Sequence, residues 1–215
     1  MRTLKIIRSK VMEASAMKLT LEVDGHPVGK VGNGKEISAE MDAQSHEIYL
    51  HGGFFADKNF CYKLTIPAGD YSYNLQIDML SLTNGYKPVL RPCGDVPGKT
   101  RTRRDTLMAA ELTELLFNEK LRAILKGLPN GRVQIVLGAN GWKLDVCSGN
   151  VRKTVSELKY SAFGGSLLGA AVNNVERNQL STPEGQLELY NMLYEQYLQY
   201  LPDYTRTAPN EYALN

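Results

Sequence analysis

Apolar and polar residues alternate with a period of two through most of the first 90 residues, which constrains the fold more than any other feature of the chain. The alternation is clearest over residues 17–23 and 71–79, where aliphatic residues and tyrosines fill every second position. Such alternation places one set of side chains on the buried face of a strand. The turn dipeptides Asp24-Gly25 and Asn33-Gly34 separate these segments. Residues 1–90 are therefore predicted to form an antiparallel β-sandwich.

Residues 19–75 also contain a series of short glycine-containing turn motifs separated by predicted strands. The stretch from Leu21 to Gly34 contains Asp-Gly, Val-Gly and Asn-Gly, and a strand and Ser45-His46 follow it. The stretch from Ile66 to Tyr71 is similar to the second half of the same pattern. Together these segments resemble the bacterial PEGA-type β-sandwich repeats, although Gln44-Ser45 stands where that pattern has Pro-Gly. The resemblance implies a sandwich with a binding or spacer role and carries over no catalytic residue.

The hydrophobic period changes across residues 91–104, which are rich in proline, glycine and basic residues. This composition is typical of a linker between domains. Residues 105–204 are predicted to form a helix-rich domain with one β-hairpin, over residues 132–146. Residues 205–215 show no periodicity and are predicted to form a flexible tail. The predicted fold class of the whole chain is α+β.

Three helical segments account for most of the predicted second domain. The first runs over residues 105–126 and ends before a glycine that can adopt the left-handed cap conformation. Apolar residues continue with helical spacing over residues 150–177. The last helix runs over residues 182–201, with Thr182 as the N-cap and Pro183 at the first helical position.

The last predicted helix carries an apolar and aromatic stripe so wide that it must be buried. Tyrosine is enriched at protein interfaces because it presents a large rigid body with a polar tip. Packing within the second domain and contact with a partner or a second copy are both open at this point. The candidate interaction surface consists of Leu187, Tyr190, Tyr194, Tyr197 and Leu201.

Three segments approach catalytic or ligand-binding motifs, and each departs from its motif in spacing. Gly94 to Thr100 has three residues between its glycines, one of them proline, where a P-loop has four. His46 and His51 are five positions apart, whereas the zinc-protease motif needs histidines four apart on a helix. Gly164 to Gly169 has Leu168 where the nucleophile elbow needs its second glycine. No catalytic, cofactor-binding or metal-ligating residue is predicted.

The charge and the cysteine content of the chain limit which partners and which cellular compartment we expect. The 25 basic and 23 acidic residues give a net charge of +2, and no nucleic-acid partner is predicted. The cysteines Cys61, Cys93 and Cys147 include no C-x-x-C pair, so neither a disulfide framework nor a zinc site is predicted. No secretion signal follows Met1, and the apolar stretch 160–174 is too short to span a bilayer. A cytoplasmic protein without a transmembrane segment or cofactor is predicted.

These observations favour a non-enzymatic binding or protein-interaction module that has a protein partner or self-associates. The prediction rests largely on the absence of a catalytic motif, so two other functions stay open. One is an enzyme whose site lies at the domain boundary and follows no motif. The other is a peripheral membrane or envelope-associated factor that uses the glycine-rich segment 160–175. The sequence does not identify a small-molecule ligand.

Overall fold

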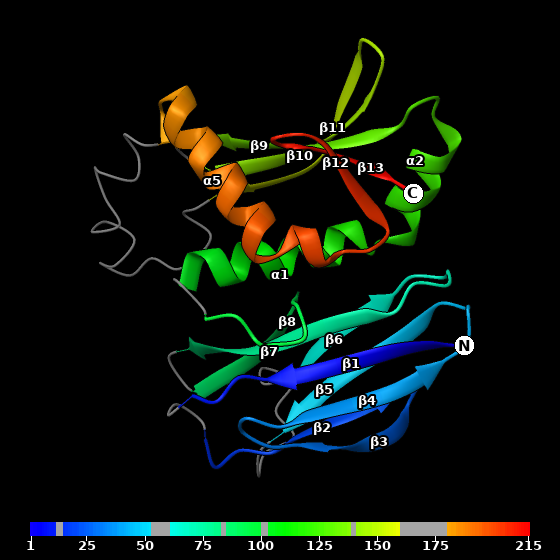
Figure 1. The fold of residues 1–215 in the computed structure, drawn as a ribbon, viewed down its shortest axis with the longest axis vertical. Helices are drawn as coiled ribbons and strands as arrows, with labels where there is room; N and C mark the ends of the chain where they lie inside the picture. The colour runs from blue at the N-terminus through cyan, green and yellow to red at the C-terminus, as the bar shows by residue number, and fades with distance from the viewer. Residues whose placement is uncertain (12–14, 53–60, 83–84, 100–102, 139–140, 160–179) are drawn as a thin grey trace. The chain divides into compact units, whose positions relative to one another are not determined.

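The computed structural model describes residues 1–11, 15–52, 61–82, 85–99, 103–138, 141–159 and 180–215. It is an α+β fold in which strands outweigh helices, 49% against 23%, so the prediction of a helix-rich C-terminal domain was wrong. The chain divides into two compact units (Figure 1). Unit 1 comprises residues 1–121 and 196–202, and unit 2 comprises residues 122–195 and 203–215.

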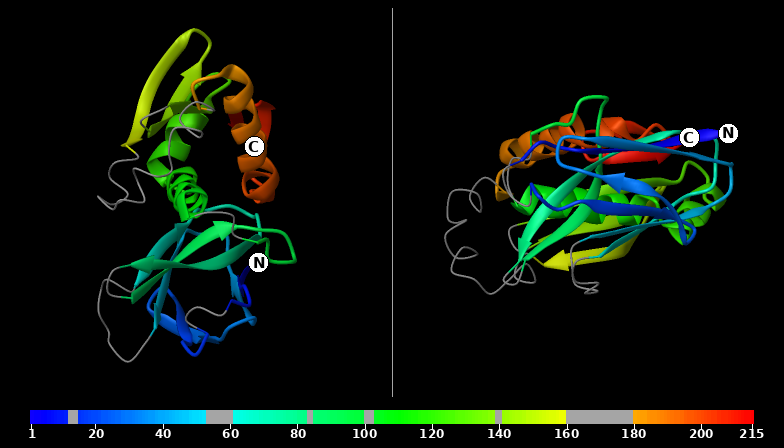
Figure 2. Two further views of the ribbon diagram at one scale, coloured as in Figure 1. Left: turned by 90° about the vertical axis from the view of Figure 1, so that its left-hand side faces the viewer. Right: turned by 90° about the horizontal axis from the view of Figure 1, so that it is seen from below.

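Unit 1 contains two four-stranded sheets that face each other (Figure 2). The first has the order β4-β1-β7-β8, with β1 Arg2–Arg8, β4 Glu36–Met41, β7 Tyr73–Leu82 and β8 Gly85–Pro92. The second has the order β3-β2-β5-β6, with β2 Leu19–Val23, β3 His26–Val31, β5 His46–Gly52 and β6 Tyr62–Ile66. The antiparallel prediction was wrong at one place, because β1 pairs with β7 in parallel. A period of two fixes which face a residue occupies but not the direction of the neighbouring strand.

Alternating apolar residues that the sequence pattern singles out, such as Leu21 of β2 and Leu50 of β5, are fully buried in the core of unit 1. Leu4 and Ile6 of β1, which the pattern did not single out, are fully buried as well. The turn between β2 and β3 places Asp24 at φ 51° and Gly25 at φ 78°, the left-handed region that Asp and Gly tolerate best. This turn therefore closes tightly at the end of the sheet.

Two helices replace the single helix predicted over residues 105–126. The first, α1, is Arg103–Leu116, and the second, α2, is Glu119–Gly127. The break falls at Asn118, whose Oδ1 accepts the backbone N–H groups of Lys120 at 3.0 Å and Leu121 at 3.2 Å. Asn118 is thus the N-cap of a new helix, a role for which asparagine is strongly preferred. The predicted linker, residues 91–104, lies within unit 1, and its ends belong to β8 and α1.

Unit 2 contains a five-stranded antiparallel sheet in place of an isolated hairpin. The strand order is β11-β10-β9-β13-β12, with β9 Arg132–Gly138, β10 Gly141–Ser148, β11 Val151–Lys159, β12 Tyr204–Ala208 and β13 Glu211–Leu214. The predicted hairpin is present as β9 paired with β10. Trp142 and Leu144 of β10 and Val133 of β9 are buried in this sheet.

Two segments of unit 2 that were predicted as helix or tail are strands. Residues 151–159 pair with β10 in an antiparallel register and form β11, in which Val151, Thr154 and Val155 are β-branched residues that favour strands. Residues 205–215 are not a flexible tail, since β13 inserts between β12 and β9 and buries Tyr212. The Gly164 to Gly169 segment lies outside the described residues.

The last long helix, α5, is Pro183–Gln196. Its N-cap was predicted correctly, because the Thr182 Oγ1 accepts the backbone N–H of Gly185 at 3.2 Å. The helix ends before residue 201, and a 3-10 turn, η3, covers Leu198–Tyr200. No helix among the described residues is long and apolar enough to cross a membrane.

Candidate functional site

Three of the five residues of the predicted interaction surface are buried. The Tyr190 hydroxyl accepts the backbone N–H of Leu137 in β9 at 3.0 Å, so its polar tip is used within unit 2. Tyr197 is buried in unit 1, with the Arg91 guanidinium 4.8 Å from its ring centroid. Leu201 is also buried. These residues are not available to a partner in this structure.

The other two residues of that surface lie on α5 in unit 2. The half-buried ring of Tyr194 has the Arg206 guanidinium 4.5 Å from its centroid and stacks near Tyr212. Leu187 is 44% exposed. The Tyr194 ring therefore already makes contacts within unit 2. The five residues do not form one exposed surface.

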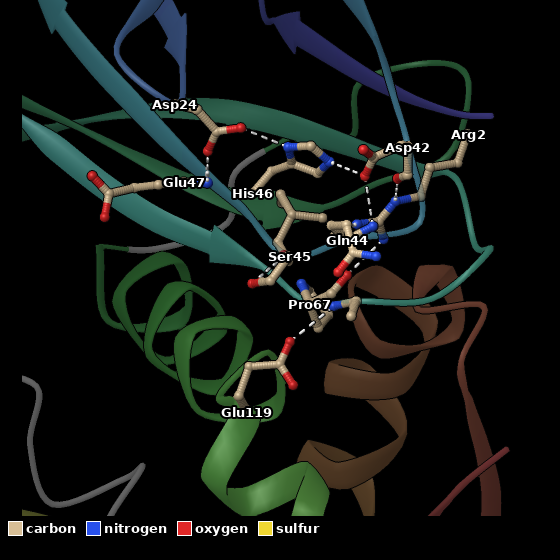
Figure 3. A network of polar contacts seen from close by, with 11 residues as sticks. Arg2, Asp24, Asp42, Gln44, Ser45, His46, Glu47, Pro67 and Glu119 are labelled. Carbon is tan, nitrogen blue, oxygen red and sulfur yellow. Dashed lines mark hydrogen bonds and ion pairs between the residues drawn. The ribbon is translucent and has the colours of Figure 1, made fainter.

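A different group of residues gathers at one end of the two sheets of unit 1 (Figure 3). We call this region the loop end; it consists of the Asp24-Gly25 turn, residues 42–45 between β4 and β5, and residues 67–70 between β6 and β7. The segments are tied together by their backbones, since Gly69 N–H donates to the Ala43 carbonyl at 2.9 Å. Glu119 of α2 accepts the Ala68 N–H at 2.8 Å.

Arg2 holds the loop end from inside the sandwich. It occupies the same phase of β1 as Leu4 and Ile6 and is only 2% exposed. Its guanidinium donates from Nε to the Asp42 carbonyl at 2.8 Å and from Nη1 to the Pro67 carbonyl at 2.6 Å, and Nη2 donates to the Gln44 carbonyl. A guanidinium offers five N–H donors in a rigid fork, so one buried side chain satisfies carbonyls from two loops.

His46 links two aspartates from different segments of the loop end. Its Nδ1 lies 2.7 Å from Asp24 Oδ2 in the β2–β3 turn, and its Nε2 lies 3.0 Å from Asp42 Oδ1 after β4. The His46 side chain is 12% exposed, whereas both carboxylates reach solvent. The ring thus bridges two acidic groups at the edge of the core.

Backbone donors fix both aspartates as well. Asp24 Oδ1 accepts the Glu47 N–H at 2.8 Å, and this bond is the main reason that the pKa of Asp24 is lowered, with His46 the next cause. Asp42 Oδ1 accepts the Gln44 N–H at 2.7 Å, which is the main cause of a lowered pKa for Asp42. Both carboxylates are ionised at neutral pH.

The pKa of His46 responds to two opposing effects. Partial burial lowers the pKa, because it disfavours a charged ring. Hydrogen bonds to Asp24 and Asp42, and the charges of these groups, raise the pKa by more, so that the net direction is upward. The loop end therefore favours the imidazolium form of His46.

A second group of titratable residues lies on α1 and β6. Burial raises the pKa of Glu111 to about 7, and the charge of Glu114 adds to the effect. The Tyr62 hydroxyl is buried, and the same two carboxylates contribute to raising its pKa after burial itself.

The histidines do not form a metal site in the part of the chain that the structure describes. His51 Nε2 lies 2.9 Å from Glu22, while His46 contacts the two aspartates of the loop end. Among the described residues, no group of three or more His, Cys, Asp or Glu side chains could hold a metal ion.

The loop end was not found by motif analysis, although part of its signal is in the sequence. Arg2 is a charged residue in the buried phase of an apolar strand, which marks a side chain with an internal partner. In the sequence, His46 stands out as part of the Ser45-His46 step of the PEGA-type pattern and as a near miss to a zinc motif. Its partners lie 22 and 4 residues away, and no spacing rule connects them.

The chain matches no protein-family model, no curated protein and no solved structure. The resemblance of residues 19–75 to PEGA-type repeats stays a prediction. The fold and the site define a two-unit α+β protein, and any functional assignment rests on the geometry described above.

Proposed function

We propose that the protein is a non-enzymatic binding module and that its loop end binds a positively charged segment of a protein partner. One observation carries this proposal: the buried Arg2 guanidinium donates hydrogen bonds to backbone carbonyls in two of the three loop segments. Loops held in this way lose little conformational entropy when a partner binds. Binding residues on loops supported by a rigid scaffold are common in recognition proteins.

The charge of the loop end supports a basic partner. Asp24, Asp42 and Asp70 are exposed carboxylates on three different segments. The lowered pKa values of Asp24 and Asp42 keep these two groups ionised at neutral pH. Ammonium and guanidinium groups of a partner would form charge-assisted hydrogen bonds to such carboxylates.

The cellular location forms part of the same proposal. The cysteines Cys61, Cys93 and Cys147, all within the described residues, form no disulfide, which fits a reducing compartment. We therefore place the protein in the cytoplasm, where it meets a protein partner or a second copy of itself.

Affinity purification from the source cell at native expression tests the proposal, with two charge-reversal variants compared with the unaltered protein. Asp70→Lys reverses an exposed charge at the loop end, and Asp70 is not among the groups that Arg2 and His46 contact in the hydrogen bonds described above. Glu184→Lys makes the same change on exposed α5 of unit 2 and is the matched control. A partner recovered with the unaltered protein and with Glu184→Lys is expected to be lost with Asp70→Lys.

Direct binding of the recovered partner to each protein completes the test. The loop-end carboxylates and the cationic groups of the partner would both be exposed to solvent, so dissolved salt screens their attraction. The affinity is therefore expected to fall as the salt concentration rises from about 50 to about 500 mM. Equal affinity of Asp70→Lys and the unaltered protein would place the interface elsewhere and contradict the proposal. A partner lost only with Glu184→Lys would assign the interface to α5.

A further inference from the structure

The two bonds of His46 require a particular protonation state. Each ring nitrogen lies within hydrogen-bond distance of a carboxylate, Nδ1 of Asp24 and Nε2 of Asp42. A neutral imidazole carries one N–H and one acceptor nitrogen, whereas an imidazolium donates from both. Only the charged ring can therefore bond both carboxylates at the observed distances.

We infer that His46 is a pH-operated clamp: its imidazolium ties the Asp24-Gly25 turn to the Asp42 carboxylate, and loss of one ring proton releases that carboxylate. This inference goes beyond the proposed binding function, because it concerns a motion of the chain itself. It holds or fails in the protein without any partner.

The geometry indicates which of the two bonds is lost. The bond to Asp24 is the shorter, at 2.7 Å against 3.0 Å, and Asp24 is also held by the Glu47 N–H. Asp24 is the less exposed of the two carboxylates. The neutral ring thus keeps its proton on Nδ1, which leaves the Nε2 lone pair facing Asp42 Oδ1. Two acceptors in contact repel, so the exposed Asp42 side chain turns away from the ring and the backbone of residues 42–45 loses one restraint.

Other charged groups around the ring influence the pH at which His46 loses its proton. Arg2 of β1 and His26 of β3 lie near enough to Asp42 and Asp24, respectively, to help lower the pKa of each carboxylate. Glu47, the next residue along β5, is paired with Lys63 of β6 at 2.6 Å. The net effect is a raised pKa for His46, above the value of about 6.5 for an unperturbed histidine. The transition therefore lies above the pH at which an unperturbed histidine titrates.

An NMR titration of the unaltered protein is the first test. The ring nitrogens of His46 are expected to show two protons at low pH and one on Nδ1 above the transition. The backbone amides of Gln44 and Ser45 are expected to shift with the same apparent pKa as the ring, and their order parameters to fall above it. Amides that do not follow the His46 ring would overturn the inference, as would a single ring proton throughout.

The substitution Asp42→Asn tests the cause of the motion. The Gln44 N–H and Nε2 of His46 contact the same Asp42 oxygen, Oδ1, so an asparagine carbonyl at that position keeps the bond to the Gln44 N–H but faces the ring without a full negative charge. In this variant the order parameters of Gln44 and Ser45 are expected to lose most of their pH dependence, and the pKa of His46 to shift downward because one carboxylate is gone. Asp70→Asn, which alters an exposed carboxylate of the same region, is expected to leave the titration unchanged. A loop that titrates in Asp42→Asn as in the unaltered protein would refute the clamp.

Discussion

Replacing Arg2 by methionine removes the donor that holds the loop end while it keeps an apolar chain of similar length in the core. The guanidinium is 2% exposed and donates to the carbonyls of Asp42, Gln44 and Pro67. Each hydrogen bond from a charged donor contributes about 1.5–3 kcal/mol when one partner is deleted. The sum for three bonds is about 4–9 kcal/mol. Since the loop carbonyls regain water once the loops open, we expect a loss of about 3–5 kcal/mol in the free energy of unfolding.

Urea denaturation followed by circular dichroism measures this loss. Arg132→Met is the matched control, because Arg132 pairs with Glu211 through a side chain that is 42% exposed. Exposed pairs contribute about 0–1 kcal/mol, so the control is expected to be nearly neutral. A loss below 1 kcal/mol for Arg2→Met, equal to that of the control, would refute the argument that Arg2 holds these loops.

Three further changes test other parts of the fold, each by its effect on the free energy of unfolding. Arg122→Met removes the ion pair, 2.5 Å long, between Arg122 and the fully buried Asp203. The free energy of unfolding is expected to fall by about 3–5 kcal/mol. Recovery of this stability in a double variant that also carries Asp203→Leu would confirm the cause. Glu111→Gln is expected to make the free energy of unfolding depend less on pH. The folded protein holds the Glu111 proton up to about pH 7, so stability falls as pH rises from about 4.5 to 7, by up to about 3 kcal/mol, and a variant with an unchanged slope would contradict this. Asn118→Ala removes the N-cap of α2 and is expected to cost about 1 kcal/mol, whereas no loss would mean that the helix break has another cause.

The sequence predicted several strands of unit 1, among them β2, β4, β6 and β7, because apolar residues recur there at every second position. It did not single out β1 or β8, and burial in β8 does not alternate. Alternation over residues 17–23 matches the burial of Leu19 and Leu21 in β2, whereas in β7 the intervening polar residues Gln76 and Asp78 are buried as well. The parallel pairing of β1 with β7 could not be predicted in the same way. It joins residues about 70 positions apart, such as Leu4 and Tyr73, and it depends on the packing of the whole sheet.

The strands of unit 2 escaped prediction for local reasons. In β11, Val151 and Val155 are four positions apart, a spacing that suits a helix and a strand alike. The last strands, β12 and β13, contain five and four residues, too few to show a clear period. Asn118 fits the polar stripe of one long helix, yet its side chain caps a second one.

The candidate site was predicted least well, because its contacts are distant in sequence. Arg2 and Pro67 lie 65 residues apart, and Arg2 and Gln44 lie 42 apart. The tyrosine stripe was a real apolar surface, but Tyr190 and Tyr197 are buried within the protein. Apolar spacing shows that a face is covered and does not show what covers it.

The central claim is that the loop end of unit 1 is the binding surface. Amide chemical shifts of the labelled protein, recorded while the partner recovered by affinity purification is added, test it most directly. The account predicts that the perturbed amides cluster on residues 24–25, 42–47 and 67–70. Perturbations confined to α5, with the loop-end amides unchanged, would contradict it.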